Sequence, residues 1–394
     1  MRANDHRIST PSVLSRRYAL ALLGGAGLAA VTTRHSFAVS PDFAAFNRRY
    51  IAEVVVPRFT RLSAVCAKWH GVIARMAQEP SAGKASLMNG GDEIIWDAWT
   101  EAEPFMTLLQ ASQSRDDSLA AWVQKPDELA DEVGALLAKT DADDLAPVRV
   151  GETSLGRHCL AAMELLLDGE GKGRDIARDF YLAESGPRRT ALLAAVVRHM
   201  AVKADAAAAT WAAIGRNGLL AGSSAQETAS RFLTDQLDFL NDIVFIKMKV
   251  EPRLDIDLVR PSAIEARLGA RIMSNLQAFN DAARSPAGFE SLLPDSDAGL
   301  RAKLRDACAT TLNLAHQSVA LGYPLPRYTG LFFTTMCCFS PCPPQEELDK
   351  KAEERNEENR LRVEALRVQI ISLRNLLQTD FATAIGLSSV LRKT

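Results

Sequence analysis

The sequence lacks the features on which nucleic-acid-binding proteins, zinc fingers and the common hydrolases depend. Its formal net charge is −2 over 394 residues and only 6% of them are aromatic, so it has neither a basic field nor stacking platforms for nucleic acid. No two cysteines have the Cys-x-x-Cys spacing of zinc sites. Gly-x-Ser-x-Gly and His-Glu-x-x-His segments are also missing, and the loop GEGKGR at 169–174 has no Gly-Lys-Ser/Thr ending. These absences exclude the common hydrolase and nucleotide-binding motifs.

What is present is the composition of a helical protein. Hydrophobic residues make up 47% and charged residues 24% of the chain, which is typical of a globular protein with a sizeable core. Long runs rich in Ala and Leu, few β-branched alternations and few turn dipeptides predict an all-α fold. The length predicts two compact units, because single cores stop growing at about 250–300 residues.

Residues 1–38 have the pattern of an export signal. The segment SRRYAL at 15–20 is close to the twin-arginine pattern, a glycine-interrupted apolar run follows it, and Ser36-Phe37-Ala38 offers small residues for cleavage. The apolar run is too short and too rich in glycine to span a membrane well. We therefore expect a periplasmic protein that begins near Val39. An uncleaved anchor is the alternative.

The rest of the chain is expected to divide at the glycine- and serine-rich stretch 215–224, giving helical units at 39–215 and 216–394. One segment, Tyr323–Pro344, does not have a helical pattern and is expected to pack on the surface or to cover a pocket. It contains Cys337, Cys338 and Cys342, which could form a disulfide in an oxidising compartment or bind a soft metal.

The stretch Leu155–Gly169 carries the first candidate site. Its leucines recur at helical spacing, and Glu164 lies on or beside that apolar stripe. A carboxylate in such a place is costly unless it is paired, hydrogen-bonded or bound to a metal. Arg157 lies two turns earlier on nearly the same face, next to His158. The segment is therefore either an internal ion pair or the floor of a site.

A second candidate lies on the helix expected over 92–110. Trp99 shares its surroundings with Glu101 and Glu103, the latter just before Pro104. These residues form either a solvated acidic patch beside core tryptophans or the wall of a pocket.

Five segments, in order along the chain, resemble the imelysin family in its predicted periplasmic branch. They are VVPRF at 55–59, WDAWTEAEPF at 96–105, CLAAMELLLDG at 159–169, IKMKVEPRL at 246–254 with Arg260-Pro261 and Glu265 after it, and LRNLLQTDFATAIGL at 373–387. The resemblance implies two helical-bundle halves related by a pseudo-twofold duplication, with a site in the groove between them. It also implies an exported protein linked to iron acquisition. Some members of the family are described as metallopeptidases.

The resemblance also argues against peptidase activity. Peptidase-type members carry Gly-x-His-x-x-Glu on the central helix, and aligning Glu164 places Cys159 at the glycine and Ala161 at the histidine. His158 lies about 120° around the helix from Glu164 and cannot substitute for that histidine. No catalytic residue is therefore assigned. The oxygen ligands Glu164, Glu103 and Glu101 suit a hard cation such as ferric iron.

We accordingly expect a periplasmic, non-catalytic binding protein that serves iron uptake. Glu164, Glu103 and Glu101 are its candidate metal ligands, and Trp99, Arg157 and His158 are its candidate pocket residues. Its expected partners are a metal or metal chelate and a membrane-associated uptake protein, and nucleic acid is not among them. Two alternatives remain open. One is an imelysin-type metallopeptidase, and the other is a structural bundle that docks a partner through Tyr323–Pro344.

Overall fold

The chain is all-α, as the sequence predicts. The computed structural model describes residues 41–88, 90–106, 108, 126–139, 147–168, 178–245, 247–249, 263–320 and 345–388, and within these ranges there is no β-strand. None of the helices in this part of the chain is long and apolar enough to cross a membrane. The expected signal at 1–38, the segment Tyr323–Pro344 and its three cysteines lie outside the described residues.

The first long helical segment is interrupted just before Pro57, a residue type that kinks helices. Helix α2 (Phe43–Tyr50) passes into a π-helical turn, η1 (Ile51–Val55), and then into α3 (Val56–Gln78). Pro57 has no N–H and its ring crowds the preceding turn, so the wider turn accommodates it at the start of α3. Asp42 is the N-cap of α2, and its side chain accepts a hydrogen bond from the Ala45 amide at 2.9 Å.

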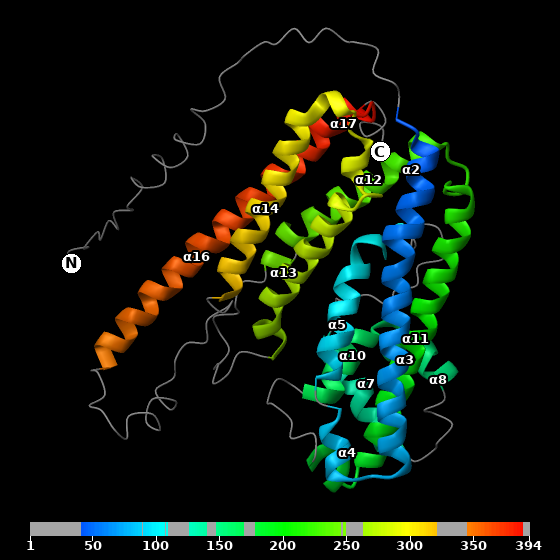
Figure 1. Cartoon of the computed structure of the whole chain (residues 1–394). Coiled ribbons are helices and arrows are strands. Elements are labelled where there is room, and N and C mark those ends of the chain that lie inside the picture. Colours follow the sequence, from blue (N-terminus) through cyan, green and yellow to red (C-terminus); the bar gives the residue numbers. More distant parts are fainter. Residues whose placement is uncertain are drawn as a thin grey trace, which may run out of the picture. The chain divides into compact units, whose positions relative to one another are not determined.

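The core of the first part of the chain forms between α3 and the long helix α11 (Gly186–Asn217), which pack along each other (Figure 1). The buried face of α3 carries Phe59, Leu62 and Trp69. Helix α5 (Gly91–Ala102) and the 3-10 turn η2 (Glu103–Phe105) cover another side of α3. The smaller elements here are α4 (Ala82–Ser86), α7 (Pro126–Ala138), α8 (Pro147–Glu152), α9 (Ser154–Arg157), α10 (Cys159–Asp168) and η4 (Arg178–Leu182).

The later part of the chain is a second group of packed helices. Helix α13 packs on α14 and on α5, and α14 runs beside α16 (Figure 1). The spacing of Val363, Leu366, Ile370, Leu373 and Leu377 predicts an apolar stripe on the closing helix, and all of these residues are buried except Val363, which is partly buried. The elements are α12 (Ala225–Phe245), η5 (Lys247–Lys249), α13 (Ala263–Arg284), η6 (Phe289–Leu292), η7 (Asp295–Asp297), α14 (Ala298–Ala320), α16 (Gln345–Leu376), η9 (Leu377–Phe381) and α17 (Ala382–Ala384).

The central helix differs from its sequence prediction because it is two helices. Helix α9 ends at Arg157, His158 has non-helical dihedral angles, and α10 begins at Cys159. Gly156 packs directly against the backbone at Val150, where a Cβ would overlap the carbonyl oxygen. This contact explains why the chain bends at 156–158, and it takes Arg157 out of helical register with Glu164.

The expected boundary at 215–224 is only partly a loop. Helix α11 continues through residue 215 and ends at Asn217, and Gly218, in the left-handed region at φ 66°, terminates it. The described residues all belong to one compact unit, Ser40–Thr394. The division into 39–215 and 216–394, and the duplication, stay predictions.

Two cysteines, Cys66 and Cys308, are enclosed in the core and form no disulfide. Burial raises the pKa of each thiol to about 12, so both remain protonated at neutral pH.

Candidate functional site

Glu164 is buried, and its partner is an arginine far along the sequence. The residue is 4% exposed on α10, and its Oε1 forms an ion pair with Nη2 of Arg271 on α13. The sequence suggested Arg157 or a metal as the partner. The structure assigns Arg271 to this role, and the side chain of Arg157 lies outside the described residues.

Arg271 is held on its other face by an aromatic ring. Its guanidinium carbon lies 3.5 Å from the ring centroid of Trp96 on α5, which is close stacking of a cation on a π-face. Burial lowers the pKa of Arg271 to about 10, and the negative charges of Asp92 and Glu103 oppose that effect. Arg271 therefore stays protonated at neutral pH.

A second buried charged group surrounds Glu103 in η2. Its Oε1 accepts a hydrogen bond from Nζ of Lys247 at 2.7 Å, and its Oε2 accepts one from Nδ2 of Asn275 at 2.7 Å. Lys247 also donates to Oδ1 of Asn275 at 2.8 Å, and Asn275 donates to the carbonyl of Thr100 at 3.3 Å. Every heavy atom of the Asn275 amide is therefore hydrogen-bonded, as a buried polar network requires.

The two groups form one polar layer because they share helix α13. Arg271 and Asn275 are four residues apart and so lie on the same face of that helix. They reach Glu164 on α10 and Glu103 in η2, while Lys247 comes from η5. The layer thus joins elements from both sides of the predicted boundary at 215. We call Glu164, Arg271, Glu103, Lys247 and Asn275 the buried charge layer.

The other residues expected in the site lie elsewhere. Glu101 pairs with Arg61 of α3, and its side chain is 34% exposed. Trp99 is 2% exposed and belongs to the hydrophobic core. His158 is partly buried in the break between α9 and α10, and its Nδ1 has no hydrogen-bond partner among the described residues.

The three predicted metal ligands do not form a preassembled metal site. Each has a cationic partner: Arg271 for Glu164, Lys247 for Glu103 and Arg61 for Glu101. Within the described ranges, no three His, Cys, Asp or Glu side chains come together in a way that could hold a metal ion. A resident metal does not fit this arrangement, and whether any of the three carboxylates binds metal stays a prediction.

A cleft of about 350 Å³ opens beside the buried charge layer, between α3, α5, α13 and α14. Thr100 and Glu101 line one side of it, and Asp281 and His316 line another. Arg58 also lines the cleft. Its Nη1 donates to the Val54 carbonyl, and no described carboxylate lies within ion-pairing distance of it. Burial lowers the pKa of this guanidinium.

Asp97 adds a carboxylate to the same cleft. Burial raises its pKa, the nearby Glu101 adds to that effect, and Arg61 opposes it. Charged groups of both signs therefore face a space large enough for a small molecule.

Sequence reasoning missed the cationic half of the buried charge layer. Arg271 directly precedes the buried Ile272 on α13, and Lys247 lies in the segment IKMK. A cation next to an apolar helical stripe was the available signal for Arg271. The pairing itself could not be read from the sequence, because 107 positions separate Arg271 from Glu164 and only the tertiary fold, in which α13 and α10 both contact α5, brings them together.

Comparisons with known proteins agree with this fold. The family model described as Imelysin matches residues 55–372. The fold is similar to the crystal structure of an imelysin-like protein from Psychrobacter arcticum 273-4, with a TM-score of 0.56 and 14% sequence identity. The similarity covers 89% of this chain and 99% of that one. No curated protein sequence matches the chain.

Proposed function

The chain belongs to the imelysin family, and from that premise we propose that it is an exported, periplasmic binding protein that serves iron uptake and does not hydrolyse peptides. Its cargo would be iron, as the ion or as a chelate. A membrane-associated uptake protein would receive that cargo.

The buried ion pair between Glu164 and Arg271 is the observation that supports a non-catalytic role. A zinc ligand or a general base needs a carboxylate that is free to bind the metal or the proton. Here the carboxylate faces a guanidinium that is itself stacked on Trp96. Ala161 stands one turn before Glu164, where peptidase-type members of the family carry histidine.

The cleft beside the buried charge layer supports a role in binding. Its volume of about 350 Å³ is within the range of small-ligand pockets. Arg58, which forms no ion pair with a described carboxylate, offers a guanidinium to an anionic chelate, and the carboxylates Asp97 and Asp281 offer oxygen atoms to a cation.

Iron binding is tested by calorimetric titration of the purified mature protein with ferrous iron and with ferric citrate. If Glu164 binds the metal, Glu164→Gln lowers the affinity for iron. The matched control is Asp235→Asn, because Asp235 is also a buried carboxylate but lies on α12 and does not line the cleft. Equal affinity of wild type and Glu164→Gln would remove Glu164 as a ligand. Absence of binding by either form of iron would remove the role in iron uptake.

Peptide hydrolysis is tested separately, on protein incubated with zinc, manganese or iron. We expect no cleavage of an unstructured protein substrate. Cleavage that a chelator stops and that Glu164→Gln abolishes would establish the metallopeptidase alternative instead.

Export is tested by fractionation of cells that produce the full chain. Replacing Arg16 and Arg17 by lysine should retain the protein in the cytoplasm with its signal uncleaved. Unchanged periplasmic delivery of that variant would contradict the twin-arginine route.

A further inference from the structure

A second charged hollow lies away from the buried charge layer, between the last turn of α13 and the first three turns of α14. Its volume is about 640 Å³. Three arginines line it, Arg284 from α13 and Arg301 and Arg305 from α14, with Asp306 as the single carboxylate in the lining. The remaining lining residues are alanines of α14, whose small side chains leave the space open: Ala298, Ala302 and Ala309.

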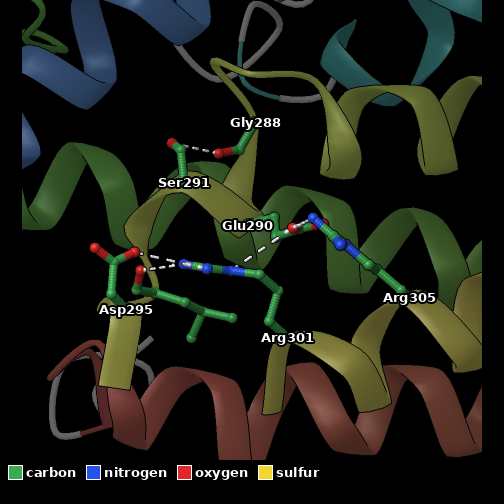
Figure 2. A network of polar contacts seen from close by, with 7 residues as sticks. Gly288, Glu290, Ser291, Asp295, Arg301 and Arg305 are labelled. Carbon is green, nitrogen blue, oxygen red and sulfur yellow. Dashed lines mark hydrogen bonds and ion pairs between the residues drawn. The ribbon is translucent and has the colours of Figure 1, made fainter. Parts of the chain in front are cut away.

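A buried carboxylate holds two of these arginines in place (Figure 2). Glu290 in η6 is 8% exposed. Its Oε2 accepts a hydrogen bond from Nε of Arg305 at 3.0 Å, and its Oε1 pairs with Nη2 of Arg305 and lies 3.7 Å from Nε of Arg301. The Nη2 of Arg301 donates to the Leu293 carbonyl at 2.8 Å. Long arginine side chains lose rotamer freedom at a cost, and here the fold has already fixed both of them.

The positive charges near the N-terminus of α14 are unfavourable for an isolated helix. The first turns of a helix carry its positive end, so cations there are unfavourable. Helix α14 has no acidic residue in its first turn, yet it carries Arg301 and Arg305 near that end. The hydrogen bonds that Arg305 donates to Glu290 raise the pKa of Arg305, so this guanidinium is charged at every physiological pH.

Arg284 adds a third cation from the opposite helix. It is exposed, and among the described residues it makes no hydrogen bond or ion pair. An ordinary surface salt-bridge network would account for the contacts of Arg301 and Arg305 with Glu290 and Asp295. It does not account for a third arginine that lines the same hollow with no partner among the described residues, or for the alanines that keep the hollow open.

We propose that this hollow is a binding site for a small multivalent oxyanion, a phosphate or a polycarboxylate. Guanidinium groups match the planar oxygen pairs of carboxylates and phosphates. The oxyanion would lie between Arg284 on one side and Arg301 and Arg305 on the other, above Ala302. Asp306 would limit the size of the anion, because its carboxylate would repel an anion that extends to that edge of the hollow. The site is separate from Glu164 and from the cleft near Arg58, so it stands whether or not the protein binds iron.

The experiment is isothermal titration calorimetry of the mature protein with inorganic phosphate and, separately, with metal-free citrate. We expect saturable binding of one of them that weakens as sodium chloride is added, because the contacts are charged and solvent-accessible. Removing one arginine from a charge-assisted contact costs about 1.5–3 kcal/mol, so Arg284→Gln should weaken binding about tenfold or more. Tighter binding of citrate assigns a polycarboxylate to the site, and tighter binding of phosphate assigns a phosphate.

Two further variants make the test specific. Arg216→Gln is the matched control, because Arg216 is also an exposed arginine in the last turn of a long helix, and it should leave binding unchanged. Ala302→Leu keeps every charge and places a bulky side chain where the anion would lie, so it should weaken binding. The proposal is overturned if neither anion binds at millimolar concentration, if Arg284→Gln and Arg216→Gln behave alike, or if Ala302→Leu binds as well as the wild type. Circular dichroism of each variant establishes that it is folded.

Discussion

The ion pair between Glu164 and Arg271 should add little to the free energy of unfolding compared with an apolar pair. Removing only one of the two charges should nevertheless destabilise the protein strongly. Both groups are nearly excluded from water, with side-chain exposures of 5% and 14%. Removing one partner of a buried pair leaves an uncompensated charge and costs about 3–5 kcal/mol. Replacing both by apolar residues of similar size is often neutral. We therefore expect Glu164→Leu and Arg271→Met each to destabilise the protein by about that amount, and the double variant to lie within about 2 kcal/mol of the wild type.

Because Arg271 also stacks on Trp96, the two single variants should not lose the same amount of stability. Arg271→Met loses the contact between the guanidinium and the indole, which is worth about 0.5–2 kcal/mol. It should therefore cost more than Glu164→Leu by roughly that amount. Arg271→Lys keeps the charge but not the planar stack, so its cost should be close to the stacking contribution alone.

The assay is urea denaturation followed by far-UV circular dichroism and by tryptophan fluorescence, with the free energy of unfolding extrapolated to water. The result that refutes the reasoning is additivity. If the double variant loses as much stability as the two single variants together, the two charges do not depend on each other and the pair is not formed in solution.

Three further predictions concern other parts of the core. The Tyr50 hydroxyl is buried without a hydrogen-bond partner among the described residues. Tyr50→Phe should therefore raise the free energy of unfolding, by up to about 1–3 kcal/mol. A loss of stability would show that the hydroxyl has a partner. Burial and the positive charge of an arginine on α11 lower the pKa of His70, so the unfolded state binds its proton first and acid destabilises the fold. The wild type should lose more stability than His70→Gln between pH 7.5 and 5, and an equal loss would contradict this. Gly156→Ala should destabilise the protein, because the new Cβ would overlap the Val150 carbonyl. Gly134→Ala on α7, where a Cβ meets no other atom, should stabilise it slightly. Equal melting temperatures of the two variants would contradict the close packing at Gly156.

The helices could be predicted from the sequence because a helix depends on local features, the spacing of its apolar residues and the residues at its ends. The stripe from Leu366 to Leu377, for example, is buried as its spacing predicts. The break at His158 could not be predicted in this way. It follows from the contact of Gly156 with the backbone at Val150, which is a property of how α8 and α9 meet.

The candidate site was predictable on its acidic side only. Glu164 on an apolar stripe signals a buried carboxylate, and its burial is observed. The identity of its partner depends on which distant helix packs against α10, and composition carries no information on that. Lys247 and Asn275 were hidden for the same reason, since each is an ordinary residue until η5 and α13 bring it to Glu103.

The burial of Cys66 and Cys308 has a practical consequence. A protonated thiol enclosed by side chains cannot react with an alkylating reagent, so modification of either sulfur has to wait until the surrounding helices part. Mass spectrometry of the native protein during such labelling would then time two separate openings, one at α3 and one at α14. The ratio of the two rates would tell whether α3 and α14 come away from the core together or one after the other.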